Sequence, residues 1–327
     1  MKIFVIIPAF KVKEHIAAVI EKIPVNVESI YVVDDCCPDK SGAYVKSKSS
    51  DPRVEVLFHD ENKGVGGAMK TGYLHALKNN ADVCIKLDGD GQMNPALIPK
   101  FLQPILDGKA DYTKGNRFHR IESLESMPFT RKFGNACLSL INKFTSGYWN
   151  IMDPTNGFTA IHRSALEELP LEKINDRYFF ESDMLFRLGT IRAVVKDIAM
   201  DSVYGDEESN LKIGTTIREF IPLYFKSFWK RVFYTYFLRD FNAASLETVI
   251  GGSLFTFGLV FGIQSWVASS AQNELASTGT VMLSVVPLIM GFQLLLSALH
   301  FDIENTPKEP IQNSNFKSNT ESSFKSE

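Results

Sequence analysis

Short apolar runs recur from Lys2 to about Asp201, and each is followed by a polar or glycine-rich string. Four runs have the length and the β-branched content of buried strands: Lys2–Ile7, Ser29–Val33, Val54–Phe58 and Val83–Leu87. After Gly64 the apolar positions recur every three or four residues, which predicts an amphipathic helix. This alternation is typical of an α/β domain with a mainly parallel sheet, whose ligands bind beyond the carboxyl ends of the strands.

The C-terminal part has a different pattern. No charged residue occurs between Glu247 and Glu274, or between Glu274 and Asp302. Each stretch can supply the ~20 apolar residues that a membrane span needs. Both are apolar on all sides, so we favour two transmembrane helices over two buried core helices.

Basic residues are scattered among many aromatic ones just before the first of these stretches. On a helical wheel Ile221, Phe225, Phe228 and Val232 share one face, with lysines on the other. This pattern predicts a helix lying in a membrane interface, and the alternative is a core-packed helix with solvated lysines. By the positive-inside rule, the basic residues place this side of the membrane in the cytoplasm.

The predicted organisation is a catalytic-type α/β domain over 1–212, interfacial helices over 213–245, a transmembrane hairpin over 246–302, and a disordered cytoplasmic tail over 303–327. The chain would thus be a multi-pass protein of the inner (cytoplasmic) membrane. With a formal net charge of −3 over 327 residues, it lacks the basic footprint of a nucleic-acid binder. Its four cysteines show no zinc spacing and are expected to be reduced thiols.

The string from Lys86 to Met93 carries the most chemistry. Asp88, Asp90 and Gln92 alternate with glycines, so their oxygen atoms would lie on one side of an extended chain. Two adjacent carboxylates favour a cation between them, and hard oxygen ligands suit Mg²⁺ or Mn²⁺ shared with a diphosphate. The spacing excludes an EF-hand, because Met93 and Pro99 stand where Gly and Glu are required. A solvated Asp-Gly turn is the alternative.

Other strings follow the remaining strands. The one from Asn62 to Gly72 nearly spells a phosphate-binding P-loop, but Met69 replaces its last glycine, so an NTPase is the minority interpretation. Gly66 and Gly67 are expected to let the chain approach a substrate. Arg117 and Arg131 are candidate phosphate partners. Glu181 is predicted at the start of a helix, as a dipole partner or an active-site carboxylate.

Taken in order, these strings resemble family 2 of the glycosyltransferases, which have the GT-A fold, and in particular the polyprenyl-phosphate sugar synthases. The resemblance covers about the first two thirds of the chain. It rests on Pro8-Ala9-Phe10, Val32-Val33-Asp34-Asp35, Asn62-Lys63-Gly64-Val65-Gly66, Asp88-Gly89-Asp90-Gly91-Gln92, Gly115-Asn116-Arg117 and Asp153-Pro154-Thr155-Asn156-Gly157-Phe158.

The resemblance implies a role for each matching residue. Asp88, Asp90 and Gln92 would surround a divalent cation, Mg²⁺ or Mn²⁺, on the diphosphate of a UDP- or GDP-sugar. The remaining nucleotide contacts would come from Pro8, Ala9, Phe10, Glu14, Asp34, Asp35, Lys63, Gly66, Lys70, Gly89 and Asn156. The catalytic set near the sugar and the acceptor phosphate would be Arg117, Arg131, Asp153 and Glu181. Two departures bear on the choice of base: Lys11-Val12 replace the usual Asn-Glu, and Cys36-Cys37 replace the usual Gly-Ser.

The implied reaction is an inverting transfer of a sugar to a polyprenyl phosphate, undecaprenyl or dolichyl, for cell-surface glycan synthesis. The alternatives are a membrane-anchored glycosyltransferase with another acceptor and a non-catalytic nucleotide-binding membrane protein. A processive polysaccharide synthase is disfavoured, because the chain lacks a Gln-x-x-Arg-Trp string and further spans. Glycines in the first span, from Gly251 to Gly262, would permit a homo-oligomer.

Overall fold

The computed structural model describes residues 1–119, 129–201 and 213–313, without the side chains of 129–131 and 213–217. The chain divides into two compact units. One comprises Met1–Phe228 together with the segment that begins at Pro307, and the other comprises Trp229–Thr306.

A seven-stranded sheet forms the centre of the first unit, in the order β3-β2-β1-β4-β6-β5-β7. Its strands are β1 Ile3–Ala9, β2 Ser29–Asp34, β3 Val54–Phe58, β4 Val83–Lys86, β5 Tyr112–Asn116, β6 Thr159–His162 and β7 Val195–Ala199. All neighbouring pairs are parallel except those of β6, which runs antiparallel to β4 and β5. The carboxyl ends of the other six strands and the start of β6 therefore meet at one edge of the sheet.

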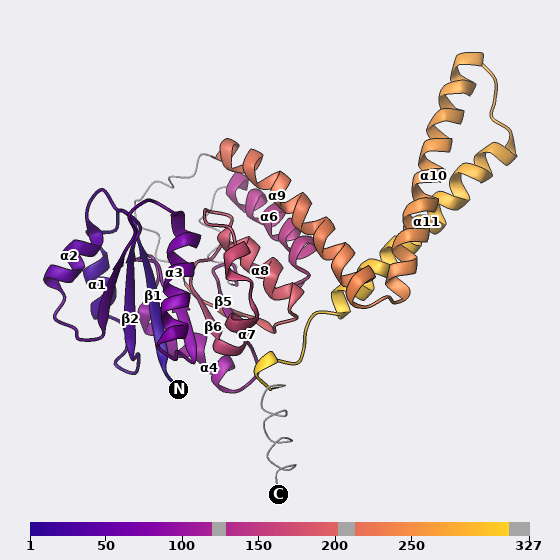
Figure 1. Cartoon of the computed structure of the whole chain (residues 1–327). Helices are drawn as coiled ribbons and strands as arrows, with labels where there is room; N and C mark the ends of the chain where they lie inside the picture. The colour runs from indigo at the N-terminus through magenta and orange to yellow at the C-terminus, as the bar shows by residue number, and fades with distance from the viewer. Residues whose placement is uncertain (120–128, 202–212, 314–327) are drawn as a thin grey trace, which may run out of the picture. The chain divides into compact units, whose positions relative to one another are not determined.

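Helices cover both faces of the sheet. The connections contain α1 Ile16–Glu21, α2 Ser41–Lys48, α3 Gly64–Lys78, the short helix Pro95–Leu97, α4 Ile98–Leu106, α6 Phe129–Ser146, α7 Arg163–Glu168, the short helix Leu171–Lys173 and α8 Phe180–Thr190. In Figure 1, strands β1 and β2 of this sheet lie between α1 and α3. Alternate residues of a strand enter opposite cores: Phe4 and Ile6 pack with α3 and α8, whereas Val5 and Ile7 pack with α1 and α4. Because both faces are covered, these strands read as continuous apolar runs in the sequence.

The four predicted strands and the helix after Gly64 are confirmed, with ends that differ by at most two residues. The P-loop interpretation does not fit, because α3 begins at Gly64 and the whole stretch from Gly64 to Thr71 is helical. Glu181 lies in the first turn of α8, as predicted.

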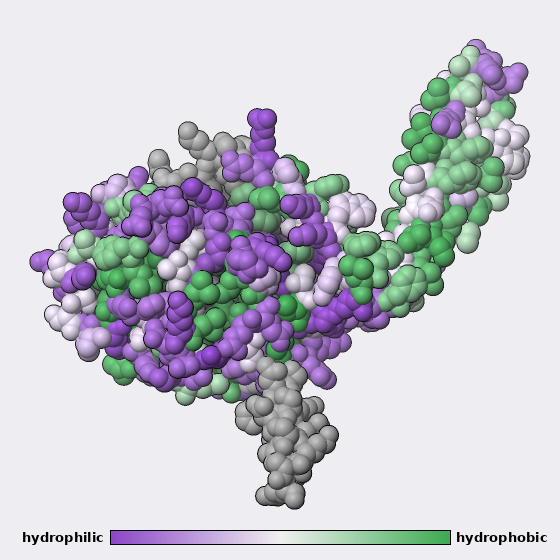
Figure 2. Space-filling model, in the orientation of Figure 1, coloured by the Kyte–Doolittle hydropathy of each residue, from purple (hydrophilic) through white to green (hydrophobic). Residues whose placement is uncertain are grey.

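The second unit is a helical hairpin. It contains the end of α9 Ile213–Phe233, a π-helical segment Tyr234–Arg239, α10 Ala243–Gln272 and α11 Thr278–Glu304. Both α10 and α11 are long and apolar enough to cross a membrane, and only 11% of each apolar window is buried. Apolar residues, green in Figure 2, cover much of this hairpin.

Glycines bring the two long helices together. A Cβ on Gly258 would lie 2.7 Å from the amide nitrogen of Leu288, and one on Gly291 would lie 2.4 Å from that of Phe255. Gly251 and Gly258 therefore pack against α11 of the same chain, whereas the sequence alone would also permit contact with a second copy. At the base of the hairpin, Arg231 and Asp302 form a buried two-pronged ion pair of 2.7 and 3.1 Å.

The exposed apolar row on α9 differs from the predicted one. Ile221 and Phe225 are exposed, as expected, but Val232 is buried and Phe228 is half-buried. Trp229 and Phe233 are exposed instead, so the apolar side chains recur every fourth residue. In the first unit, the opposite side of α9 packs through Tyr224, whose hydroxyl lies 2.7 Å from that of Ser182.

The segment after α11 returns to the first unit, and the disorder expected over 303–327 does not extend to its beginning. Residues 303 and 304 belong to α11, and Ile311 is buried in the core beside α7 and α8. The Asp111 carboxylate accepts hydrogen bonds from the amides of Ile311 (3.0 Å) and Gln312 (3.2 Å). Residues 314–327 lie outside the described part of the chain.

Candidate active site

The acidic turn begins where β4 ends, at the ligand-binding edge of the sheet. Asp90 Oδ1 accepts a hydrogen bond of 3.0 Å from the amide of Gln92, and Gly91 has a φ of +81°, which few other residues tolerate. A Cβ on Gly89 would lie 3.1 Å from Val12 and 3.2 Å from Ile7. The turn therefore packs against the end of β1, and Asp88, Asp90 and Gln92 belong to one compact loop.

A buried lysine lies under this turn. The Lys86 ammonium is 2.6 Å from Asp88 Oδ1, 3.3 Å from Glu181 Oε1 and 3.3 Å from the carbonyl oxygen of Gly157. Burial alone would lower the pKa of Lys86, but the two carboxylates raise it above its ordinary value, so the side chain stays charged. Lys86 thus joins three strings that are far apart in the sequence: the acidic turn, the loop before β6 and the start of α8.

A second buried lysine lies in the same row across the sheet. Both Lys86 and Lys114 pair with Thr159 of β6, and Lys114 also pairs with Asp197 of β7, so their side chains point to one face. The Lys114 ammonium donates a 2.6 Å hydrogen bond to the carbonyl oxygen of Asn156. Burial lowers the pKa of Lys114 to about 8, against the attraction of nearby carboxylates.

The two lysines therefore hold consecutive carbonyl groups, those of Asn156 and Gly157. A Cβ on Gly157 would lie 2.3 Å from Asp88 Oδ2 and 2.5 Å from the Lys86 ammonium, so only glycine fits there without displacing the acidic turn. Neither lysine was singled out from the sequence. The available signal, for Lys86 only, was a lysine at the end of the buried apolar strand Val83–Lys86, a position that charged residues occupy only with partners.

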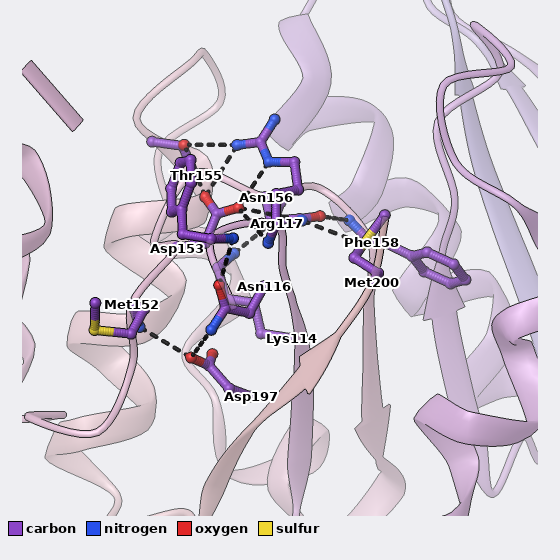
Figure 3. Close-up of polar contacts among 11 residues, drawn as sticks. Lys114, Asn116, Arg117, Met152, Asp153, Thr155, Asn156, Phe158, Asp197 and Met200 are labelled. Atoms are coloured by element: carbon purple, nitrogen blue, oxygen red, sulfur yellow. Dashed lines mark hydrogen bonds and ion pairs between the residues drawn. The ribbon is translucent and has the colours of Figure 1, made fainter. Parts of the chain in front are cut away.

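Arg117 and Asp153 form a two-pronged ion pair, with Nε and Nη2 of the arginine 2.7 and 3.0 Å from the carboxylate (Figure 3). Asp153 is fully buried, whereas the Arg117 side chain is 25% exposed. Asn156 Nδ2 also contacts Asp153, at 3.4 Å. The structure thus brings together three predicted site residues. The side chain of Arg131, the other arginine of the predicted catalytic set, lies outside the described part of the chain.

Asp197 extends this cluster, as Figure 3 shows. Its Oδ2 accepts 3.0 Å hydrogen bonds from Asn116 Nδ2 and from the amide of Met152. Its Oδ1 is buried and has no hydrogen-bond partner among the described residues. Burial raises the pKa of Asp197 to about 6, although the Met152 amide and Lys114 oppose the shift. No pattern in the sequence singles out Asp197.

The paired aspartates after β2 organise the neighbouring loops. The Asp34 carboxylate accepts hydrogen bonds from the amides of Cys37 (2.8 Å) and Gly42 (2.6 Å), and so holds the loop that leads into α2. The Asp35 carboxylate accepts from the amides of Lys63 (2.8 Å) and Gly64 (2.7 Å). Asp35 also lies 2.7 Å from the ring of His59. Both carboxylates are buried beneath the ligand-binding edge.

The loop after β1 lies beside the Cys36-Cys37 string. Ala9 is buried, whereas Phe10 and Glu14 are exposed and Pro8 is half-buried. The amide of Lys11 donates a 3.1 Å hydrogen bond to Cys37 Sγ. Lys11 and Cys36 have φ values of +58° and +52°, a conformation that Asn and Gly adopt most readily. The two departures from the family strings therefore fall on left-handed residues.

The start of α3 packs against a backbone segment. The amides of Gly66 and Gly67 donate to the Asp176 carbonyl, and a Cβ on Gly66 would lie 2.1 Å from the carbonyl of Asn175. The Lys70 ammonium donates to the Ile174 carbonyl at 3.0 Å and pairs with the Asp176 carboxylate. The close approach predicted for Gly66 and Gly67 is therefore to the backbone of Asn175 and Asp176. Lys63 is exposed.

The donor set suits a metal ion that a diphosphate helps to hold. Two carboxylates and a carboxamide within one turn are hard oxygen ligands of the kind that Mg²⁺ and Mn²⁺ prefer. Among the described residues, no group of three or more His, Cys, Asp or Glu side chains is placed to hold a metal ion. These residues fit a divalent cation bound together with a phosphorylated ligand.

A mainly parallel sheet with one antiparallel strand, and an acidic turn at the carboxyl end of β4, are features of the GT-A fold. Residues 4–170 match Glycosyl transferase family 2, and the chain belongs to this family. The resemblance seen in the sequence is thereby confirmed, and the chain is a glycosyltransferase.

Two relatives whose names give an activity are similar to about two thirds of the chain. The UDP-N-acetylglucosamine–dolichyl-phosphate N-acetylglucosaminyltransferase of Methanococcus voltae is 29% identical over 229 residues, covering 66% of this chain and 90% of the relative. The undecaprenyl-phosphate mannosyltransferase of Micrococcus luteus is 28% identical over 207 residues, covering 62% and 84%.

Solved structures support the fold. Glucosyl-3-phosphoglycerate synthase of Mycobacterium tuberculosis, in complex with Mn²⁺, UDP and glucosyl-3-phosphoglycerate, superimposes with a TM-score of 0.53 at 18% identity. The match covers 69% of this chain and 79% of the synthase.

Proposed function

We propose that this enzyme transfers a sugar from a UDP- or GDP-sugar to a polyprenyl phosphate at the cytoplasmic face of the membrane. The observation that carries the proposal is the continuation of a family 2 catalytic domain into two helices of membrane-spanning length. Relatives whose names include dolichyl or undecaprenyl phosphate support the acceptor class. Those names include both N-acetylglucosamine and mannose, so the sugar is left open.

On the donor side, Asp88, Asp90 and Gln92 would hold Mg²⁺ or Mn²⁺, which would supply positive charge to the leaving diphosphate. The exposed Phe10 and Glu14 would contact the nucleoside. Asp34 and Asp35 would act mainly by fixing the loops around it, since their oxygens already accept backbone hydrogen bonds.

On the acceptor side, Arg117 would bind the lipid phosphate, and we assign Arg131 to the same anion. The buried Asp153 holds the Arg117 guanidinium in a fixed orientation. An oxygen of the acceptor phosphate would form the new bond to the anomeric carbon as the bond to the nucleoside diphosphate breaks. A phosphate monoester is already anionic at neutral pH, so the step requires no general base.

The path of the chain supports a hairpin that crosses the membrane twice. Arg231, before α10, pairs with Asp302, at the end of α11, so the two ends of the hairpin lie together. The segment after α11 rejoins the first unit at Ile311. No Lys or Arg occurs between Arg239 and Lys308, whereas basic residues precede α10. The positive-inside rule then favours a catalytic domain in the cytoplasm.

The test is transfer of labelled sugar by the full chain purified in detergent. A panel of labelled UDP- and GDP-sugars is incubated with undecaprenyl phosphate and Mg²⁺ or Mn²⁺, and then with EDTA. We expect metal-dependent label in an acid-labile lipid that partitions into organic solvent. Binding of a nucleotide-sugar without labelled lipid would overturn the proposed acceptor, and transfer that survives EDTA would overturn the proposed metal.

Asp90→Asn should lower transfer at least about 100-fold, because a carboxylate that would hold the metal becomes a neutral amide. The variant should still be inserted in membranes. Asp60→Asn changes an exposed carboxylate in the loop after β3 and is the matched control, expected to keep normal transfer. Full turnover by Asp90→Asn would contradict the metal assignment.

A further inference from the structure

Lys86 places a fixed positive charge against the acidic turn. It is buried to 1% exposure, and its ammonium lies 2.6 Å from Asp88 Oδ1. Glu181 Oε1 is 3.3 Å from the same nitrogen, and Gly157 supplies a carbonyl oxygen. One oxygen of Asp88 therefore contacts a cation of the protein, and the other lies beside Gly157.

We propose that Lys86 is a positioning residue that sets the metal affinity of the acidic turn. It orients Asp88 and Glu181, and as an internal cation it disfavours a divalent ion bound to the turn alone. The proposal rests on the proposed function, because it assumes that Asp88 is a ligand of the metal ion that accompanies the nucleotide.

Charge balance is the physical reason. A divalent ion on Asp88 would lie close to a buried ammonium group, and like charges at such separations repel strongly inside a protein. The diphosphate of a nucleotide adds negative charge, which offsets this repulsion. Lys86 would therefore make metal binding depend on the nucleotide, so that the metal arrives and leaves together with the diphosphate.

The variant Lys86→Met keeps the length of the side chain and removes its charge. The full chain is purified in detergent, and bound Mn²⁺ is measured by electron paramagnetic resonance, alone and with UDP or GDP. We expect the wild type to bind Mn²⁺ at least about tenfold more tightly with nucleotide than without. For Lys86→Met, affinity for Mn²⁺ alone should rise about tenfold, and the benefit from nucleotide should shrink.

Lys114→Met is the matched control. Lys114 lies in the same row of the sheet, is equally buried and holds the neighbouring carbonyl, that of Asn156, 2.6 Å from its ammonium. Among the described residues, no hydrogen bond or ion pair joins Lys114 to the acidic turn, so its loss should change Mn²⁺ affinity less than about twofold. A purely structural role for Lys86 would weaken Mn²⁺ binding in Lys86→Met, whereas the proposal predicts that binding becomes tighter.

Glu181→Gln gives the reciprocal test and applies even if Lys86→Met does not fold. The substitution removes the negative charge of Glu181, so that Asp88 alone offsets the positive charge of Lys86. Mn²⁺ should therefore bind more weakly than in the wild type. An unchanged or weaker affinity in a folded Lys86→Met, or a tighter one in Glu181→Gln, would overturn the role of Lys86. A wild type that binds no Mn²⁺ even with nucleotide would overturn the metal site as well.

The Mn²⁺-binding assay does not measure sugar transfer to lipid. A protein that shows the expected order of Mn²⁺ affinities but labels no polyprenyl phosphate would lose its proposed acceptor and retain the role of Lys86.

Discussion

At the scale of single residues, the candidate site contains charged side chains that are buried from solvent. Lys86, Lys114, Asp153 and Asp197 are buried or largely buried, and each contacts an opposite charge or a backbone group. Such networks hold loops in one arrangement, because moving any member would leave a charge without compensation. Asp197 is the weakest member, since one of its oxygens has no partner among the described residues.

Asp197→Asn should stabilise the protein at neutral pH. The folded pKa of about 6 lies above the ordinary 3.8, so the folded state binds more protons between these values. The stability that the protonated carboxyl provides is therefore lost as pH rises from about 4 to about 6. The neutral amide of Asn removes this loss.

Thermal unfolding of Asp197→Asn and of the wild type, compared between pH 4 and 8, tests this expectation. The variant should unfold at a higher temperature at pH 7, and its advantage should disappear towards pH 4. Asp60→Asn, at an exposed position, should show no such trend. A pH-independent difference between Asp197→Asn and the wild type would contradict the assigned pKa.

The sequence predicted which polar residues gather at one edge of the sheet better than it predicted the contacts among them. Asp88, Asp90, Arg117, Asp153 and Glu181 were found from polar strings at strand and helix ends, because a parallel sheet brings these ends to one edge. The sequence could not reveal that Lys86 pairs with Asp88 and Glu181, or that Lys86 and Lys114 hold the carbonyl groups of the loop before β6. Their partners lie on other strands and helices, and pairing across a sheet depends on register, which a local pattern does not encode.

At the scale of elements, the segment after α11 behaves as a clasp on the first unit, defined by Ile311–Asn313. The Asp111 carboxylate accepts the amides of Val194, Ile311 and Gln312, at 2.8, 3.0 and 3.2 Å. The side chain of Gln312 donates to the carbonyl groups of Ile105 and Ala110. Polar composition predicted disorder here, but one buried isoleucine and an aspartate that pairs backbone amides order the segment.

Ile311→Ala should destabilise the first unit by about 2–4 kcal/mol, because it removes a side chain that is only 9% exposed and leaves a cavity. Val25→Ala is the control, since Val25 is 94% exposed and its truncation should cost little. The measurement is the midpoint of thermal unfolding in detergent, together with the rate of proteolysis after Glu304. Equal effects of the two variants would show that the clasp does not pack in solution.

At the scale of the whole molecule, the path of the chain restricts how many times it can cross a membrane. The chain leaves the first unit through α9, passes through α10 and α11, and returns to the first unit at Pro307. A folded domain that includes both ends of a hairpin lies on one side of a membrane, so the number of crossings between them is even. The charge pattern predicts that this side is the cytoplasmic one, because no Lys or Arg lies between Arg239 and Lys308.

Epitope tags test this arrangement directly, one placed in the loop between α10 and α11 and one after Glu327. In spheroplasts of bacteria that express the full chain, antibody should reach the loop tag from outside, and the tail tag only after permeabilisation. Retained sugar transfer, or retained thermal stability, shows that a tagged chain is folded. A tail tag accessible in intact cells would reverse the orientation. A loop tag protected until permeabilisation would show that α10 and α11 do not cross, and that their apolar surface is covered by lipid at one face or by protein.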